Sequence, residues 1–268
     1  MAKLRSYAIA SHLGPTLLVT TVTFLLATTI WWEGPALVIA FGIALGQFIV
    51  GWSNDLFDFR DDLRHNRMSK PLVTGALKPA ELKRAIFIVL PIALLVNLLG
   101  PLGLKGGAVS MLGIGLGLSY NFYLKPTALS PVPYALAFAL LPAALVISTD
   151  RTPPLWIMWA GALLGMSAHF ANVLKDFKED KESGITSLPI RLGRIPSRFI
   201  TAAFLIAATI ILDSAKSNTA ILVIGTMAAS FSIFMPRAVL FKLLMLIALL
   251  DVALLVGAAG ELIGSRTI

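Results

Sequence analysis

The chain has 268 residues, of which 57% are apolar and 13% charged, and its mean hydropathy is +0.85. So few charged groups cannot cover the surface of a soluble domain of this size. The composition also excludes a disordered chain, and the absence of cysteine excludes a disulfide scaffold. The apolar residues form long runs rather than an alternating pattern, which argues against a transmembrane β-barrel. We therefore expect an all-α, polytopic membrane protein.

Nine apolar stretches are candidate membrane spans, and the seventh is short for the hydrocarbon core. They cover residues 8–30, 35–53, 85–103, 107–124, 130–149, 154–174, 199–212, 219–235 and 243–260. The first stretch is too long for a signal-peptide core and has no clear cleavage site, so we expect no signal peptide. The sequence thus predicts nine transmembrane helices.

The basic residues predict an orientation for these spans. Of the 22 Lys and Arg residues, 18 fall on one membrane face and four on the other. By the positive-inside rule the richer face is cytoplasmic, which places the N-terminus inside and the C-terminus outside. We expect a multi-pass protein of the cytoplasmic membrane. Its net charge of +8 then reflects contact with the lipid bilayer, and no nucleic-acid partner is expected.

Two charged segments between spans, residues 54–83 and 175–196, hold nine of the 14 acidic residues. They align without a gap at a constant offset of 118 residues. The matched positions include Asn54 with Asn172, Asp58 with Asp176, Asp62 with Asp180, Ser69 with Ser187, Pro71 with Pro189 and Gly75 with Gly193. We interpret residues 1–268 as one membrane-embedded domain with an internal repeat covering residues 40–83 and 158–201.

In each segment an amide and two carboxylates recur every fourth residue. The two triads are Asn54, Asp58 and Asp62, and Asn172, Asp176 and Asp180. On a helix each triad forms a column on one face. Oxygen ligands without a nearby His or Cys pair suit Mg²⁺ rather than zinc, and Mg²⁺ is usually held by carboxylates together with substrate phosphates. Two facing columns can therefore hold a diphosphate between metal ions.

Two other interpretations of the acidic segments stay open. Carboxylates at span ends are often simply solvated, with neighbouring Arg and Lys side chains as surface partners. They can also mark an ion or proton pathway in a transporter, although transporter carboxylates lie nearer the bilayer midplane than these do.

The motifs themselves resemble those of a known family. Asn54–Asp62 reads NDLFDFRDD and is followed by Lys70-Pro71-Leu72 and Gly75. Asp176–Asp180 reads DFKED, and the stretch Tyr120–Lys125 lies between the two motifs. This order is similar to that of the UbiA superfamily of intramembrane prenyltransferases, and the resemblance covers essentially the whole chain.

The resemblance implies a bundle of nine transmembrane helices around a central cavity. It implies transfer of a prenyl group from a prenyl diphosphate to a small acceptor, which we expect to be aromatic, with release of diphosphate. Two Mg²⁺ ions, with Mn²⁺ as a possible substitute, are the implied cofactors. A terpene cyclase that ionises the same diphosphate without an acceptor is the alternative within the superfamily, and a membrane transporter is the alternative outside it.

The resemblance also assigns roles by position. The metal ligands are Asn54, Asp58, Asp62, Asp176 and Asp180, of which the four aspartates carry catalysis. The cations expected on the diphosphate are Arg67, Lys70, Lys125 and Lys181. The residues expected near the acceptor are His12, Asn172, His169 and Tyr120.

For two of the acceptor residues the sequence allows both a functional and a purely structural interpretation. His12 stands where many members of the superfamily carry an arginine, and it is otherwise an interfacial histidine. His169 lies about two turns before Asp176 on nearly the same face, and it is otherwise a packed polar residue.

Overall fold

The computed structural model describes residues 2–215 and 219–236, together with single residues between 239 and 249. All regular structure in these ranges is helical. The elements are α1 (Ala2–Ala10), α2 (Leu13–Ala27), α3 (Glu33–Arg64), α4 (Pro79–Leu99), α5 (Gly103–Ser119), the π-helical turn η1 (Tyr120–Leu124), α6 (Pro131–Ile147), α7 (Leu155–Lys175), α8 (Phe177–Glu182), α9 (Leu188–Leu192), α10 (Arg194–Ala215) and α11 (Thr219–Ser232). The predicted ninth span, residues 243–260, lies almost entirely outside the described residues.

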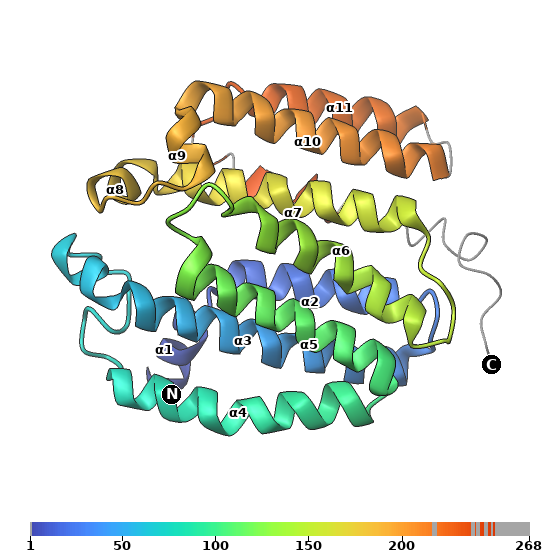
Figure 1. Ribbon diagram of the computed structural model, residues 1–268, viewed down its shortest axis with the longest axis horizontal. Coiled ribbons are helices and arrows are strands. Elements are labelled where there is room, and N and C mark those ends of the chain that lie inside the picture. Colours follow the sequence, from blue (N-terminus) through green and yellow to red (C-terminus); the bar gives the residue numbers. More distant parts are fainter. Residues whose placement is uncertain are drawn as a thin grey trace.

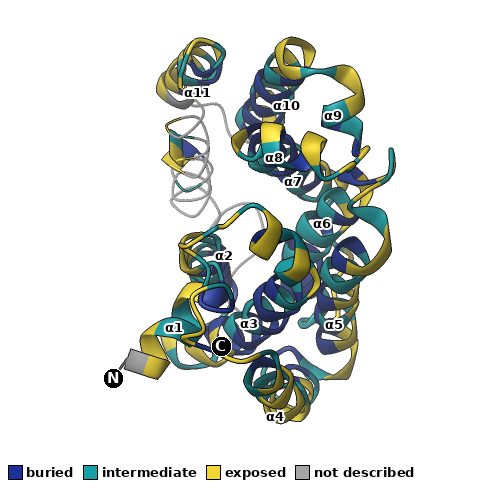
Figure 2. Cartoon of the chain, turned by 90° about the vertical axis from the view of Figure 1, so that its left-hand side faces the viewer, coloured by how far each residue is buried: buried dark blue, intermediate teal, exposed yellow. Residues whose placement is uncertain are grey.

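The long helices lie side by side along the longest axis of the molecule (Figure 1). Successive helices pack against one another, as α3 with α4, α5 with α6, α6 with α7, and α7 with α10. Viewed nearly along the helices, this succession runs from α4 at one edge to α11 at the other (Figure 2). The all-α expectation is therefore confirmed for the part of the chain that the structure describes.

Membrane spans are recognised here by helix length and hydropathy. Four helices qualify alone: α3, α4, α7 and Arg194–Ser214 of α10. A fifth span arises if α1 and α2 are counted together. Helices α6 and α11 are apolar but shorter. The structure thus contains four or five clear candidate spans among its described residues, and the number nine stays a prediction.

The first predicted span, residues 8–30, is not one straight helix. It breaks after Ala10, and α1 and α2 meet at 72°. His12 lies at the break with φ 56°, in the left-handed region that ends a helix. The backbone of Ser11 packs directly on Gly51 of α3, where an added Cβ would lie 2.6 Å from the Ser11 carbonyl oxygen. The bend is therefore fixed by a backbone contact that only glycine permits.

The two acidic segments are built differently, which corrects one expectation. Helix α3 continues without interruption through Asn54, Asp58 and Asp62, so the first triad forms the predicted column. Helix α7 ends at Lys175, and Asp176 has φ −104° and ψ 19°. The second triad is therefore not on one helix, and the expectation of a second continuous column was wrong.

The break at Asp176 has a physical reason in the packing of the next residue. Phe177 is buried in an apolar cluster with Ala171, Leu174 and Leu205. The new direction of the chain lets α8 bury Phe177 and Asp180 while Lys178, Lys181 and Glu182 stay exposed. The Asp176 carbonyl accepts a hydrogen bond from the Asp180 amide at 2.9 Å and so begins the new helix.

The loop after α3 is held by its own apolar contacts. Leu72 and Leu77 are buried in a cluster with Trp52 and Leu82. This cluster fixes the segment between α3 and α4 against both helices. The basic side chains of that segment are thereby kept beside the acidic end of α3.

One local feature supports the internal repeat. Gly75 and Gly193 occupy equivalent positions at the offset of 118, and both have a positive φ, 74° and 91°. Each turn precedes a span, α4 in the first copy and α10 in the second. The repeat as a whole stays a prediction.

Candidate active site

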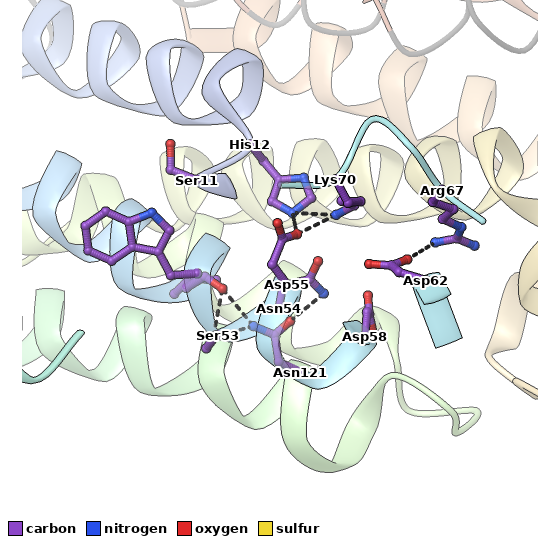
Figure 3. A network of polar contacts seen from close by, with 12 residues as sticks. Ser11, His12, Ser53, Asn54, Asp55, Asp58, Asp62, Arg67, Lys70 and Asn121 are labelled. Carbon is purple, nitrogen blue, oxygen red and sulfur yellow. Dashed lines mark hydrogen bonds and ion pairs between the residues drawn. The ribbon is translucent and has the colours of Figure 1, made fainter. Parts of the chain in front are cut away.

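The two carboxylates of the acidic column of α3 are paired with cations, and Figure 3 shows the pair of Arg67 and Asp62. Lys125 Nζ donates to both oxygens of Asp58, at 2.7 and 2.6 Å. Arg67 Nη1 donates to Asp62 Oδ1 at 2.9 Å. Asp62 is buried, and Asp58 and both cations are largely shielded from solvent. Two of the four predicted diphosphate cations therefore lie against two of the predicted metal ligands.

Arg67 also has an unused donor. Its Nη2 is buried and has no hydrogen-bond partner among the described residues. Burial disfavours the guanidinium charge, but Asp62, Asp176 and Asp180 around it raise the pKa of Arg67 overall. A buried guanidinium nitrogen without a partner, beside carboxylates from both segments, is suited to an additional anionic ligand.

The two acidic segments meet at the same end of the bundle. Ser183, just after α8, donates from Oγ to Asp61 Oδ2 on α3 at 2.8 Å. The loops also meet nearby, because Thr186 Oγ1 donates to the Pro126 carbonyl at 2.7 Å. The structure therefore brings the first acidic segment, the segment of Lys125 and the second acidic segment together.

Asp180 is the buried carboxylate of the second segment. Burial raises the pKa of the Asp180 carboxyl to about 6, and the positive charges of Lys125 and Arg67 counteract part of that effect. Asp176 is half-buried at the break between α7 and α8. Lys125 and Arg67 thus act on Asp180 of the second segment as well as on Asp58 and Asp62, with which they are paired.

The donor set suits a hard divalent cation, but it is not gathered into a ready-made cluster. Among the described residues, no group of three or more His, Asp or Glu side chains is close enough to hold a metal ion. The chemistry of the oxygen ligands fits Mg²⁺. Lys125 and Arg67 lie against two of these carboxylates.

Asn121 is a site residue that the sequence reasoning did not single out. Its Nδ2 donates to the Val50 carbonyl at 2.9 Å and to Ser53 Oγ at 2.8 Å. Its Oδ1 accepts a hydrogen bond from Asn54 Nδ2 at 3.3 Å. Asn54 Oδ1 is thus left as an acceptor for another group. The only sequence signal was the stretch Tyr120–Lys125, which contains Asn121.

The π-helical turn η1 positions this stretch. Its closing hydrogen bond runs from the Lys125 amide to the Tyr120 carbonyl at 2.9 Å, five residues back. Such turns are rare, and they frequently occur at functional sites. Here the π-helical turn contains Asn121, which contacts Asn54, and it is followed directly by Lys125, which contacts Asp58.

A third acidic residue of α3, Asp55, holds two predicted site residues. Lys70 Nζ lies 2.5 Å from Asp55 Oδ1, and His12 Nε2 lies 3.1 Å from the same oxygen (Figure 3). Asp55 is only 1% exposed, and its Oδ2 has no hydrogen-bond partner among the described residues. Lys70 is therefore bound outside the triads, and His12 is tied to α3 from the bend between α1 and α2.

The other predicted acceptor residues lie deeper. His169 is fully buried, with Nε2 3.0 Å from Ser130 Oγ. Its ring lies 5.5 Å from that of Tyr120 and 5.0 Å from that of Tyr134. Asn172 is half-buried on α7. The acceptor roles of His12, His169, Tyr120 and Asn172 stay predictions.

Lys181 lies apart from this arrangement. It is exposed on α8 and lines a different pocket, together with Arg191 and Arg194. Three of the four predicted diphosphate cations, Arg67, Lys70 and Lys125, thus lie at the acidic end of α3.

Fold and site together define a polytopic membrane protein with interleaved acidic and basic side chains at one end of its bundle. The family model of the UbiA prenyltransferase family matches residues 16–259. The chain therefore belongs to the UbiA prenyltransferase family, and it is a multi-pass membrane enzyme of that family. No curated protein matches the sequence.

Several solved structures have the same fold. A UbiA homologue from Archaeoglobus fulgidus bound to DMAPP and Mg²⁺ is 15% identical, with a TM-score of 0.72 over 94% of this chain and 99% of that chain. A UbiA homologue from Aeropyrum pernix K1 is 18% identical, with a TM-score of 0.71 over 92% of this chain and 96% of that chain. A digeranylgeranylglyceryl phosphate synthase structure is 17% identical, with a TM-score of 0.69, and the match covers 97% of this chain and 99% of that chain.

Proposed function

We propose that the protein transfers a prenyl group from a prenyl diphosphate to a small aromatic acceptor within the membrane and releases diphosphate. The observation that carries this proposal is the pairing of Arg67 and Lys125 with the carboxylates of α3, together with the unpartnered Arg67 Nη2. Fold neighbours from Archaeoglobus fulgidus bind DMAPP or GPP together with Mg²⁺, which supports the same ligand class here.

The cations of the site bind the diphosphate in this proposal. Arg67 donates from Nη2 to a phosphate oxygen, and Lys125 and Lys70 turn from their carboxylates toward the same group. Charge-assisted contacts of this kind strengthen as negative charge develops on the departing diphosphate. The apolar bundle excludes water from the allylic cation that remains. The diphosphate role of Lys181, the fourth predicted cation, stays a prediction, since Lys181 is exposed and lines a pocket with Arg191 and Arg194.

The carboxylates of the two segments would hold the metal. We assign Asn54, Asp58 and Asp62 to one Mg²⁺ ion and Asp176 and Asp180 to a second, with Mn²⁺ as a possible substitute. These residues would hold Mg²⁺ where its charge would offset that of the leaving diphosphate. Asn121 orients Asn54 so that its Oδ1 is available as a ligand.

The acceptor is assigned to the side of the site where the α1–α2 bend lies. His12 is partly exposed there beside Lys70, whose Nζ lies 3.4 Å from His12 Nε2. A glyceryl phosphate acceptor is the second candidate, because a digeranylgeranylglyceryl phosphate synthase is among the fold neighbours.

The test is product analysis by mass spectrometry. The full-length protein in lipid vesicles is incubated with geranylgeranyl diphosphate, Mg²⁺ and either aromatic or glyceryl phosphate acceptors. We expect a prenylated aromatic product that disappears with EDTA and returns with Mg²⁺. A prenylated glyceryl phosphate would shift the acceptor assignment. A cyclic hydrocarbon without acceptor would indicate a cyclase, and ion flux without diphosphate release would indicate a transporter.

A further inference from the structure

A pocket that combines basic and apolar side chains lies outside the candidate active site. It has a volume of about 930 Å³ and is formed by α8, α9 and the beginning of α10. Its charged lining residues are Lys178, Lys181, Arg191, Arg194 and a single carboxylate, Glu182. None of the proposed metal ligands is among the residues that line it. The pocket therefore combines four positive charges with one negative charge, on residues of the second charged segment that are not among the proposed metal ligands.

Two of these cations are held in place without being neutralised. Arg191 donates from Nε to the Thr186 carbonyl at 2.7 Å and from Nη2 to Thr186 Oγ1 at 3.3 Å. The Arg194 guanidinium lies over the ring of Phe177, 4.9 Å from its centre. Within the described part of the chain, neither arginine forms an ion pair with a carboxylate. Fixed cations without a counter-charge are pre-organised for an anion, because little conformational freedom is lost on binding.

The carboxylate of the pocket does little to cancel this charge. Glu182 lies 3.8 Å from Lys178, and both side chains are largely exposed. Such a pair is weak in water. Lys181, Arg191 and Arg194 therefore keep their charge available to a ligand.

The pocket is at the end of two membrane spans. Helix α7 ends at Lys175, and the span within α10 begins at Arg194. The two helices pack against each other, and the end of α7 and the beginning of α10 lie at the same end of the bundle (Figure 1). This is the level at which the headgroups of a bilayer meet a membrane protein.

An apolar track leads away from the cations along α10. Ile195 is 70% exposed and Phe199 is 55% exposed. They are four residues apart, so they lie one above the other on the same face of the helix. The surface thus changes from basic to apolar along the direction in which a lipid molecule changes from headgroup to acyl chain.

We propose that this pocket binds the phosphate headgroup of an anionic phospholipid, with an acyl chain lying along Ile195 and Phe199. Basic pockets at the ends of transmembrane helices bind such headgroups. Arginine suits the role, because its planar guanidinium can bind two phosphate oxygens at once. The proposal is independent of the transferase reaction and of its acceptor.

The test is native mass spectrometry of the full-length protein after exposure to equal amounts of phosphatidylglycerol and phosphatidylcholine. The wild type should retain phosphatidylglycerol preferentially. The double variant Arg191→Gln/Arg194→Gln should lose this preference by about fivefold per charge removed, or about 25-fold in total. The matched control, Lys83→Gln/Arg84→Gln, removes two exposed charges from α4 and should keep the preference.

Further variants separate charge from folding. Arg191→Lys/Arg194→Lys keeps the charge and should lose only the part of the preference that depends on bidentate guanidinium contacts, so it should retain more of the preference than the Gln variant. Glu182→Gln removes the carboxylate that lines the pocket and should increase the preference. The proposal is overturned if the Gln variant of the pocket and its α4 control retain equal amounts of phosphatidylglycerol. It is also overturned if inorganic phosphate alone displaces the lipid, because the site would then recognise free phosphate.

Discussion

Replacing Asp55 should destabilise the protein strongly, although Asp55 belongs to neither acidic triad. The carboxylate is 1% exposed and holds Lys70 and His12 on one oxygen. In Asp55→Ala, both partners lose their acceptor, and the ammonium of Lys70 is left in a largely shielded position. The variant tests whether Asp55 maintains the arrangement of the α1–α2 bend, the loop after α3 and α3 itself.

The expected magnitude follows from the type of contact. A hydrogen bond involving a charged group contributes about 1.5–3 kcal/mol. Removing one partner of a buried ion pair costs about 3–5 kcal/mol, because the other charge is left uncompensated. Lys70 retains 18% exposure and regains some hydration, so we expect the free energy of unfolding to fall by about 3 kcal/mol. Asp55→Asn keeps an acceptor oxygen and should cost less.

Reversible unfolding in mixed detergent micelles measures this loss. The double variant Asp55→Ala/Lys70→Met removes the stranded charge together with its partner. The loss of unfolding free energy in the double variant should be smaller, by about 1.5–3 kcal/mol, than the sum of the losses in Asp55→Ala and Lys70→Met. Strict additivity of the two substitutions, or a loss below about 1 kcal/mol in Asp55→Ala, would refute the assignment of Asp55 as the anchor of Lys70.

Two further predictions concern the acidic segments and the orientation. Asp58→Ala and Asp176→Ala should each lower kcat by about a hundredfold or more, because charge stabilisation by a metal ion lowers the transition-state free energy by several kcal/mol. Glu182 is exposed, and Glu182→Ala should leave steady-state turnover nearly unchanged. Equal losses in all three variants, each checked for folding by a melting curve, would contradict the assignment of the metal ligands. A cysteine placed at Gly184 should react with an impermeant maleimide only from the cytoplasmic side, and one at Ser214 only from outside. Reversed labelling would overturn the orientation, and the chain has no native cysteine to obscure the result.

The sequence predicted those features that depend on residue type and spacing within one segment. The helical class follows from the apolar runs, and the column of Asn54, Asp58 and Asp62 follows from their spacing on α3. Arg67 and Lys125 were predicted beside the acidic residues, and both lie there. These inferences succeeded because each rests on local periodicity or on a motif.

The features that the sequence did not predict depend on contacts between distant segments. The bend at His12 is fixed by the approach of Ser11 to Gly51, which only the packed helices bring about. The break at Asp176 follows from the burial of Phe177 against α10, and no glycine or proline marks it. The hydrogen bond between Asn121 and Asn54 depends on a π-helical turn, and no pattern of residues in the sequence predicts that turn. Membrane helices tolerate such interruptions where neighbouring helices satisfy the backbone.

The pairing of Lys125 with Asp58 and of Arg67 with Asp62 has a thermodynamic consequence for ligand binding. A divalent ion that binds alone must displace Lys125 and Arg67 from their carboxylates, and the positive charges of these two side chains are then unpaired. When a diphosphate binds together with the metal ion, the two displaced side chains pair with the diphosphate instead. Metal and diphosphate should therefore bind with positive cooperativity, and each should raise the affinity for the other by the same factor. A calorimetric titration of Mg²⁺ with and without inorganic diphosphate measures that factor directly. Because of the two ion pairs, the affinity for Mg²⁺ alone should be low and should rise when diphosphate binds.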